Sequence, residues 1–356
     1  MSRPTIRNDL ASLEGYHSPQ VDVDVRLNTN EAPGPPPAGF SEAVAAAAKD
    51  VAWHRYPDRG ATALRTAIGN LHGVGPEQVF CANGSNEVLQ TVLLTFAGPG
   101  RTVLTFEPTY ALHGHIARLT GARTIEINRD DKFFVDPAVA VETILAERPA
   151  VTFLCSPNNP TGIVEPTETI TAVLAAVSEV GGLLVLDEAY GQFSPFAGEA
   201  LLDDETPLVV SRTYSKTWAM AGARLGYLLA PAWLVEDLEK VVLPYHLDAI
   251  KQAAGLAALD FLDEMEERVS SIVEERGRIE AALSDMGARV WPSGANFILF
   301  QPPQANGDEV WQRLVDASVL VRNTSGWDHL SGCLRVTVGT PDDNTRFLNA
   351  FREAIA

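Results

Sequence analysis

Short apolar runs alternate with helical periods through the first two thirds of the chain. The runs are continuously apolar, as expected of buried strands that helices cover on both faces of a parallel sheet. They span Thr102–Phe106, Val151–Cys155, Leu183–Leu186 and Leu208–Val210. Between them, Leu64, Ile68 and Leu71 share one helix face. Gly73 should end that helix. The alternation predicts an α/β domain built on a doubly wound, mainly parallel sheet.

The pattern changes after residue 245. Residues 246–286 are rich in Ala, Leu and Glu and predict one or two long helices. Strand candidates with helices between them follow and predict a smaller α+β domain: Asn296–Phe300, Val319–Arg322 and Leu334–Val338. A Pro-rich stretch closes an N-terminal arm. We therefore expect three parts: an arm of residues 1–39 that joins the small domain, a large domain of residues 40–245 and a small C-terminal α+β domain of residues 246–356.

The charge balance argues against two classes of partner. The 356 residues include 46 acidic and 27 basic ones, a formal net charge of -19, whereas nucleic acids and anionic membranes bind basic patches. The first ten residues do not resemble a signal peptide, and no apolar run reaches the ~18 residues of a membrane helix. The three cysteines form no CxxC pair, which fits a reducing compartment. We expect a soluble, cytoplasmic protein without nucleic-acid or membrane partners.

Polar segments follow four of the predicted strands, at the place where ligands of open α/β sheets bind. The first is Asn83-Gly84-Ser85-Asn86, before a helix expected to begin near Glu87. Free N–H groups at a helix N-terminus, a glycine and a hydroxyl together can bind an anion. The same residues also fit an ordinary N-capping turn. The chain has no GxGxxG sequence and no P-loop sequence, which disfavours those two nucleotide sites.

The second place is Asp187, which closes the apolar run of residues 183–186. A carboxylate there loses hydration and needs a cationic partner or strong hydrogen bonds. It fits a group that keeps a bound pyridine nitrogen protonated, so that the ring can accept electrons. A metal ligand or a cap on the following turn is the alternative. Tyr190, three residues on, could reach the same ring.

The third place is Lys216, at the end of the segment Ser211-Arg212-Thr213-Tyr214-Ser215-Lys216. Nearby positive charge disfavours its ammonium form and favours a nucleophilic amine. Thr213, Ser215 and Arg224 would suit a phosphate beside it. A strand before the lysine and a helical run after it favour this interpretation over a solvated surface lysine.

The fourth place is the loop of residues 156–162, in which two prolines and a glycine hold Asn159 in a fixed position. A purely structural turn is the alternative. Together the four places supply an anion site, a pyridinium partner, an amide and an imine-forming lysine, which match pyridoxal 5'-phosphate. The spacing of His113 and His115 is that of metal ligands, but no third ligand cluster accompanies them. We expect a packed or exposed pair and no metal.

Several motifs carry a resemblance that covers essentially the whole chain. SPNNPTG at 156–162, LDEAY at 186–190 and SRTYSK at 211–216, followed by Gly-x-Arg, resemble fold-type I aminotransferases. Five further segments resemble the histidinol-phosphate aminotransferases within that group: LNTNEAPGPPP at 27–37, HRYPD at 54–58, NGSNE at 83–87, PYHL at 244–247 and LRVTVGT at 334–340.

The resemblance implies a large cofactor-binding domain and a role for each matching residue. Lys216 would hold the cofactor as a Schiff base and later move a proton between the substrate Cα and the cofactor. Asp187 would pair with the pyridinium nitrogen, and Tyr110 would stack on the ring. Tyr190 and Asn159 would bind the phenolic oxygen. The cofactor phosphate would be held by Ser85, Asn86, Thr213, Ser215 and Arg224.

The resemblance also implies a substrate pair and a partner. L-Histidinol phosphate would give its amino group to 2-oxoglutarate in histidine biosynthesis. Arg335 would bind the anionic group of the substrate, and the substrate phosphate would meet Arg322, Tyr16 and Tyr245. The protein would be a homodimer in which Tyr56 reaches the cofactor phosphate of the partner subunit.

Three positions depart from the family pattern, namely Ala32, Asn86 and Asp248. They touch the substrate side and one cofactor contact. An aromatic-amino-acid aminotransferase and a phosphothreonine decarboxylase of the same fold therefore stay open as alternatives. A catalytically silent cofactor-binding module is a third, although the lysine that it would not need is intact.

Overall fold

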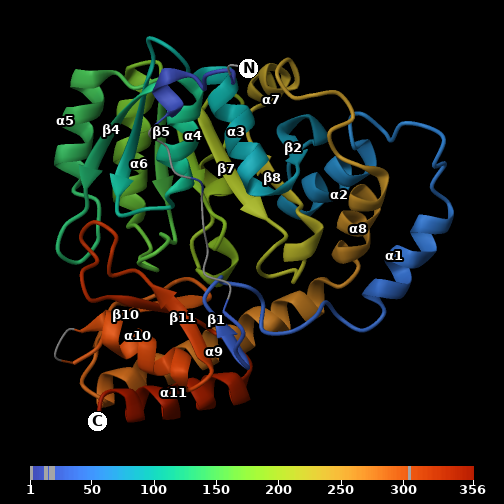
Figure 1. Cartoon of the computed structure of the whole chain (residues 1–356). Coiled ribbons are helices and arrows are strands. Elements are labelled where there is room, and N and C mark those ends of the chain that lie inside the picture. Colours follow the sequence, from blue (N-terminus) through green and yellow to red (C-terminus); the bar gives the residue numbers. More distant parts are fainter. Residues whose placement is uncertain (1–2, 12–14, 16–20, 304–305) are drawn as a thin grey trace.

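The computed structural model describes residues 3–11, 15, 21–303 and 306–356, so Tyr16 lies outside the described residues. Two sheets organise these residues (Figure 1). The larger sheet has seven strands and the smaller has five. In Figure 1 the smaller sheet and helices α9, α10 and α11 lie below the larger sheet. This arrangement places the carboxyl ends of the large sheet's parallel strands toward the smaller unit.

The larger sheet has the strand order β2-β8-β7-β6-β5-β3-β4. Strands β3 to β7 run parallel, and β8 is antiparallel to both of its neighbours. The strands are β2 (Val79–Ala82), β3 (Thr102–Glu107), β4 (Arg123–Asn128), β5 (Val151–Cys155), β6 (Leu183–Asp187), β7 (Leu208–Thr213) and β8 (Gly226–Leu229). The predicted doubly wound sheet is confirmed, but the antiparallel β8 was not foreseen.

Helices cover both faces of this sheet because consecutive residues of its buried strands point to opposite sides. On β6, Leu184 and Leu186 enter one core, whereas Leu183 and Val185 enter the other. The first core takes in α2 (Thr62–His72), α5 (Pro137–Glu147), α6 (Thr167–Glu179) and α8 (Ala249–Leu259). The second takes in α3 (Gly84–Phe96), α4 (Leu112–Thr120) and α7 (Ala232–Glu239). As predicted, α2 ends at Gly73, which has a φ of 68°.

The smaller sheet has the order β1-β11-β12-β10-β9. Its strands are β1 (Val25–Leu27), β9 (Arg289–Val290), β10 (Phe297–Gln301), β11 (Val319–Asn323) and β12 (Leu334–Thr337). The N-terminal strand β1 pairs in parallel with β11, so residues far apart in the chain share one sheet. A third core lies between this sheet and the helices α9 (Leu262–Asp285), α10 (Gly307–Asp316) and α11 (Pro341–Ala354).

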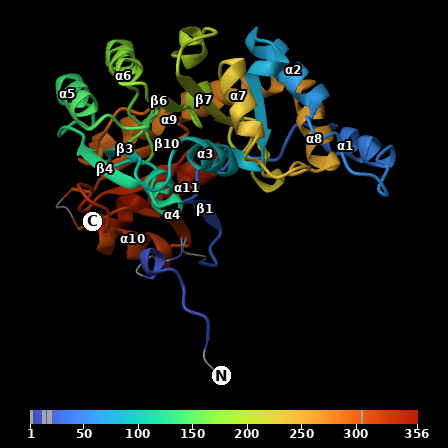
Figure 2. The same ribbon diagram turned by 90° about the horizontal axis from the view of Figure 1, so that it is seen from above.

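The packing of α8 bears on the domain boundary, which stays a prediction. Helix α8 contacts α1 (Phe40–Lys49) and α2, and both views show it beside them (Figures 1 and 2). Its Ala254 and Ala258 belong to the core of the larger sheet. These contacts favour a boundary after α8 rather than at residue 245.

Over the described residues, no helix combines the length and the apolar character that crossing a membrane requires.

Candidate active site

The carboxyl ends of β2, β3, β5, β6 and β7 meet at a cavity of about 330 Å³ that the smaller sheet closes from the other side. Twelve of the predicted site residues line it: Ser85, Asn86, Tyr110, Asn159, Asp187, Tyr190, Thr213, Ser215, Lys216, Arg224, Arg322 and Arg335. Residues 28–31, which follow β1, line it as well. The cavity therefore collects residues from both sheets and from the N-terminal segment.

Lys216 lies in the connection between β7 and β8. The helical run predicted after it is wrong: a loop with one short 3-10 turn at Ala221–Ala223 leads into β8. The Lys216 ammonium donates to the carbonyl oxygen of Thr29 at 3.3 Å and lies 5.7 Å from the centre of the Tyr190 ring. Burial, with a further contribution from Arg335, lowers the pKa of Lys216 from 10.5 to about 7. The amine is thus available in its neutral, nucleophilic form near neutral pH.

Asp187 ends β6 and is buried. Its Oδ1 accepts from the hydroxyl of Ser211 at 3.0 Å and from the N–H of Ala189 at 3.1 Å. Its Oδ2 lies 2.9 Å from Nε2 of His113. The bond from the Ala189 N–H caps the following turn, which was one of the alternatives for Asp187. The carboxylate also lines the cavity. Three hydrogen bonds offset the cost of burying this carboxylate and fix its orientation.

The segment at the start of α3 lies close to Arg224 and to β8. Asn83 makes no side-chain cap on α3, contrary to the N-capping alternative, and its N–H and amide both donate to Glu87 Oε2. The helix therefore begins at Gly84, earlier than predicted. A Cβ atom on Gly84 would lie 2.7 Å from Nη2 of Arg224, and one on Gly226 would lie 2.3 Å from the N of Ser85. Both glycines are needed for this close approach.

Arg224 brings a fixed positive charge to the same place. Its backbone is left-handed, with a φ of 54°, and its Nη1 donates to the Ser215 hydroxyl at 3.3 Å. The N–H of Ser215 in turn donates to the Thr213 hydroxyl at 3.0 Å. Because β8 runs back antiparallel to β7, Arg224 returns to the residues that precede Lys216. Hydroxyls, backbone N–H groups and a guanidinium thus surround one small space, as a phosphate requires.

Asn159 and Tyr190 line the same cavity. The Asn159 Oδ1 accepts from Nη1 of Arg335. The Tyr190 hydroxyl accepts from the Asn30 amide at 2.9 Å, which leaves its own proton to donate into the cavity. Burial raises the pKa of Tyr190 to about 12. The hydroxyl therefore remains a proton donor at neutral pH.

Arg322 and Arg335 face one another across β11 and β12. Directly opposed residues of an antiparallel pair point to the same side of the sheet, and both arginines line the cavity. Arg335 is buried and donates to the Asn28 carbonyl oxygen at 3.0 Å. Two like charges at facing positions repel each other unless an anion lies between them. The pair thus favours an anionic ligand at this end of the cavity.

Tyr56 and Tyr245 do not line the cavity of their own chain. Their rings stack with centroids 4.4 Å apart, and both are exposed, by 78% and 42%. Asp248, one of the departures from the family pattern, caps α8 by accepting from the N–H of Lys251 at 2.8 Å. Asn86, another departure, accepts from the Tyr110 hydroxyl at 3.1 Å inside the cavity.

Comparison with known proteins decides the family. Residues 23–351 match the family Aminotransferase class I and II. The chain belongs to this family. It is 44% identical to the histidinol-phosphate aminotransferase of Frankia casuarinae, over 97% of this chain and 89% of that protein. It is 43% identical to the enzyme of the same name from Mycolicibacterium smegmatis, over 98% and 93%.

A solved structure supports the same conclusion for the fold. The crystal structure of histidinol-phosphate aminotransferase from Sinorhizobium meliloti in complex with pyridoxal-5'-phosphate has a TM-score of 0.90 to this chain, with 25% identity over 98% of this chain and 97% of that one. The predicted fold-type I architecture and the resemblance to histidinol-phosphate aminotransferases are confirmed.

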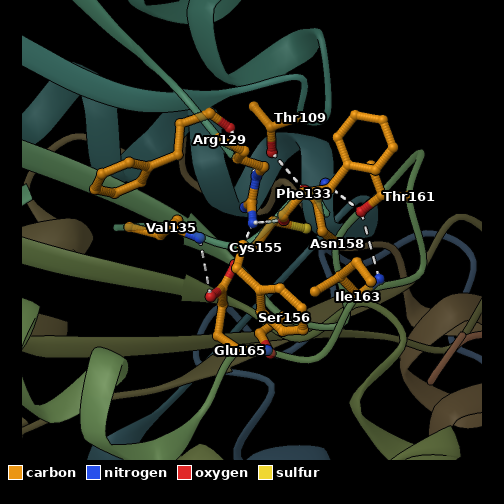
Figure 3. A network of polar contacts seen from close by, with 12 residues as sticks. Thr109, Arg129, Phe133, Val135, Cys155, Ser156, Asn158, Thr161, Ile163 and Glu165 are labelled. Atoms are coloured by element: carbon orange, nitrogen blue, oxygen red, sulfur yellow. Dashed lines mark hydrogen bonds and ion pairs between the residues drawn. The ribbon is translucent and has the colours of Figure 1, made fainter. Parts of the chain in front are cut away.

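This aminotransferase holds its site loops with a buried polar network (Figure 3). Asn158 is fully buried and accepts from the Thr109 hydroxyl at 3.0 Å. Its amide donates to the Pro108 carbonyl oxygen at 3.0 Å and to the Thr161 hydroxyl at 2.8 Å. Asn158 therefore ties the loop that carries Tyr110 to the loop that carries Asn159.

A buried ion pair supports the same loop in the aminotransferase. Arg129 and Glu165 are ion-paired with both side chains 0% exposed, and Figure 3 shows them beside the carboxyl end of β5. Glu165 also accepts from the N–H of Val135 at 3.3 Å, and its own N–H donates to the Ser156 hydroxyl at 3.0 Å. Burial raises the pKa of Glu165, and Arg129 opposes this effect. Glu165, at the end of residues 156–165, is thus joined both to Arg129 and to Ser156 at the start of this segment.

Two residues of the aminotransferase site were not given a role from the sequence. His113 was expected to be a packed or exposed histidine, and it is fully buried against Asp187 with its ring stacked on Phe153. Trp327 follows β11 and lines the cavity. A polar residue on an apolar helix face was the available signal for His113. An aromatic residue within a Ser-Gly loop after a strand was the signal for Trp327. Within the described parts of the chain, no group of three potential ligands could hold a metal.

Proposed function

We propose that this aminotransferase uses pyridoxal 5'-phosphate to move an amino group between L-histidinol phosphate and 2-oxoglutarate, with Lys216 holding the cofactor as a Schiff base. The names of the related enzymes support histidinol phosphate as the substrate. The S. meliloti complex supports pyridoxal 5'-phosphate as the cofactor. The activity belongs to histidine biosynthesis. The roles proposed for the site residues are those that the family resemblance implies, and the meeting of twelve of these residues at one cavity supports them.

The residues present fit this cofactor. An amine, a carboxylate and a group of hydroxyls with a guanidinium lie around one cavity, provided by Lys216, Asp187 and the cluster around Arg224. These are the partners that an aldehyde, a pyridine nitrogen and a phosphate require. The close approach allowed by Gly84 and Gly226 keeps the proposed phosphate site small. We assign that site to Ser85, Asn86, Thr213, Ser215 and Arg224.

When bound, the cofactor supplies a carbonyl that condenses with amines and a ring that accepts electrons from the substrate carbon. Asp187 would hold a proton on the ring nitrogen by its negative charge. Tyr190 and Asn159 would donate to the phenolic oxygen, and Tyr110 would cover the ring. Lys216 would move a proton at the substrate Cα. Its lowered pKa suits this task, because a general base works best when its pKa is close to the working pH.

One observation favours a phosphate-bearing substrate. The same cavity that holds Lys216 also holds Arg322 and Arg335 at facing positions of β11 and β12. A single carboxylate needs one such arginine, whereas a phosphate with two negative charges satisfies both. We assign Arg335 and Arg322 to the anionic group of the substrate. Tyr16, outside the described residues, is proposed to join them.

We propose a homodimer in which Tyr56 and Tyr245 enter the site of the partner subunit. Their exposure and their absence from the lining of their own chain's cavity support this assignment.

The three cysteines are free and buried, which supports our proposal that the protein is in the reducing cytoplasm.

A comparison of amino donors tests this function. The purified enzyme is loaded with pyridoxal 5'-phosphate and mixed with 2-oxoglutarate, and glutamate formation is measured with histidinol phosphate and with phenylalanine. We expect a much larger kcat/KM for histidinol phosphate. A larger value for phenylalanine would support an aromatic-amino-acid aminotransferase. Carbon dioxide release from phosphothreonine would support the decarboxylase, and the absence of any turnover would support a silent module.

A further inference from the structure

Trp327 occupies the wall that separates the active-site cavity from a neighbouring cavity of about 340 Å³. Three residues line both cavities, namely Thr109, Ala111 and Trp327. The second cavity is acidic, because Glu107, Glu126 and Asp328 line it together with the single cation Arg118. The indole therefore lies between the proposed anion-binding end of the active site and a region of opposite charge.

The loop that carries Trp327 is fixed by buried hydrogen bonds. Thr324, which is fully buried, donates from its hydroxyl to the Cys333 carbonyl oxygen at 2.8 Å. The N–H of Trp327 donates to the Thr324 carbonyl oxygen at 2.9 Å, and its carbonyl oxygen accepts from Leu330 at 3.1 Å. The indole also packs on a small core that includes Leu330 and Cys333. The ring is thus held in place by its own loop rather than by the ligand.

Arg322 lies 5.4 Å from the centre of the Trp327 ring. A cation at this distance over an indole is attracted to the ring face. The facing Arg335 is held instead by the Asn28 carbonyl oxygen, by Asn159 and by the Phe297 ring at 5.1 Å. Each of the two opposed arginines therefore has an aromatic ring to orient it. The two guanidinium groups remain at the same end of the cavity in spite of their mutual repulsion.

We infer that Trp327 is a specificity-determining residue: it orients Arg322 toward the phosphate of the amino donor and closes the wall between the two cavities. The inference rests on the proposed function and adds to it the residue that favours phosphate-bearing donors over others. Removal of the indole would loosen Arg322 and join the active site to the acidic cavity. Both changes weaken binding of a dianion more than binding of a donor without phosphate.

The test compares Trp327→Leu, which keeps apolar volume but removes the aromatic face, with Trp327→Phe, which keeps a face. Trp233→Leu, at an indole 42% exposed on α7, is the matched control. Steady-state kinetics of each holoenzyme give kcat/KM for histidinol phosphate and for phenylalanine. Inorganic phosphate is also tested as a competitive inhibitor of the half-reaction with glutamate. This inhibition constant measures anion binding apart from turnover.

For Trp327→Leu we expect kcat/KM for histidinol phosphate to fall about three- to tenfold through KM, with a matching rise in the inhibition constant of phosphate. The value for phenylalanine should change less. Trp327→Phe should recover part of the loss, and Trp233→Leu should behave as the wild type. Equal losses for both donors, or an unchanged inhibition constant, would overturn the inference. If the wild type did not use histidinol phosphate as an amino donor, the proposed function would be wrong. The inhibition constants of phosphate would still decide the role of Trp327.

Discussion

Burial sets the chemistry of the two central side chains. The Lys216 amine donates at 3.3 Å to the backbone oxygen of Thr29, and burial and the charge of Arg335 lower its pKa although Glu31 acts in the opposite direction. Asp187 is in the opposite situation, because a hydroxyl, an N–H and an imidazole surround its carboxylate. The lysine is thus easy to deprotonate, whereas the aspartate has the partners that a negative charge needs.

The first prediction concerns the pH dependence of cofactor capture. Since the pKa of Lys216 is lowered from 10.5 to about 7, its neutral fraction rises as the pH passes through 7. The rate at which the cofactor-free protein captures pyridoxal 5'-phosphate should rise in the same range and then level off. Stopped-flow absorbance measures it, with N-acetyllysine in parallel to correct for titration of the cofactor itself. A rate that keeps rising toward pH 10 would contradict the lowered pKa.

The lowered pKa of Lys216 also predicts how the free energy of unfolding depends on pH. Between about pH 7 and 10.5 the unfolded chain binds a proton at this lysine that the folded chain does not. The free energy of unfolding of the cofactor-free protein should therefore increase with pH through this window. Urea unfolding of the wild type and of Lys216→Met should show the difference, because the methionine variant lacks this contribution.

The second prediction concerns Asp187→Asn, which keeps the shape and removes the charge. We expect kcat to fall on the order of 10²–10³-fold, because a neutral amide does not stabilise a protonated ring nitrogen. Ser211→Ala, which removes one hydrogen bond to the same carboxylate, should cost about tenfold or less. Steady-state kinetics with saturating donor and acceptor compares the two. A kcat for Asp187→Asn equal to that of Ser211→Ala would contradict the proposed charge effect.

At the scale of elements, the loops that carry the site residues are held by buried polar groups. Asn158 joins the loops after β3 and β5. The buried Arg129–Glu165 pair holds the far end of the loop after β5. On the neighbouring strands, Arg212 pairs with Glu188 at 2.6 Å between the ends of β6 and β7. Asn158, Glu188 and Arg212 are each adjacent in the chain to a residue that lines the cavity. The strand ends can therefore present ligands without depending on the ligand for their shape.

The third prediction concerns Glu165→Ala. It leaves the Arg129 guanidinium buried without its carboxylate and should destabilise the protein by about 3–5 kcal/mol. Glu147→Ala is the control, because the Arg123–Glu147 pair has side chains 58% and 41% exposed and should matter by less than about 1 kcal/mol. Urea unfolding followed by fluorescence measures both. Similar losses for the two variants would contradict the role given to burial.

The sequence predicted much at this scale and missed what depends on distant contacts. Continuous apolar runs located the central strands, and polar residues after them located the cavity, because parallel strands end at one edge. The helix expected after Lys216 is a loop instead, since the chain must return along β8 to bring Arg224 beside Ser215. The bond between His113 and Asp187 joins residues 74 positions apart, so a local pattern could single out His113 but not its partner.

At the scale of the whole molecule, the cavity forms where the two sheets meet. The N-terminal strand β1 belongs to the smaller sheet, and the residues after it reach the larger one: Thr29 contacts Lys216, and Asn30 contacts Tyr190. Arg335 on β12 contacts Asn159 on the loop after β5. The stacked pair Tyr56 and Tyr245 remains exposed on the larger unit. We expect a second subunit to cover it.

The fourth prediction tests whether Tyr56 serves the partner subunit. Lys216→Ala should be inactive, and Tyr56→Ala should lose at least about tenfold in cofactor affinity or activity. Unfolding and refolding an equal mixture of the two should restore about a quarter of the wild-type activity, because half of the dimers then hold one complete site. Each variant refolded alone is the control. No gain on mixing would show that Tyr56 acts within its own chain.

The central claim is that Lys216 is the amine that holds the cofactor, and borohydride reduction tests it most directly. The sequence offers five lysines: Lys49, Lys132, Lys216, Lys240 and Lys251. The protein is incubated with pyridoxal 5'-phosphate, reduced, digested and mapped by mass spectrometry. We expect the cofactor on the peptide that contains Lys216 and on no other. A label on any of the other four lysines, or no label at all, would contradict the claim.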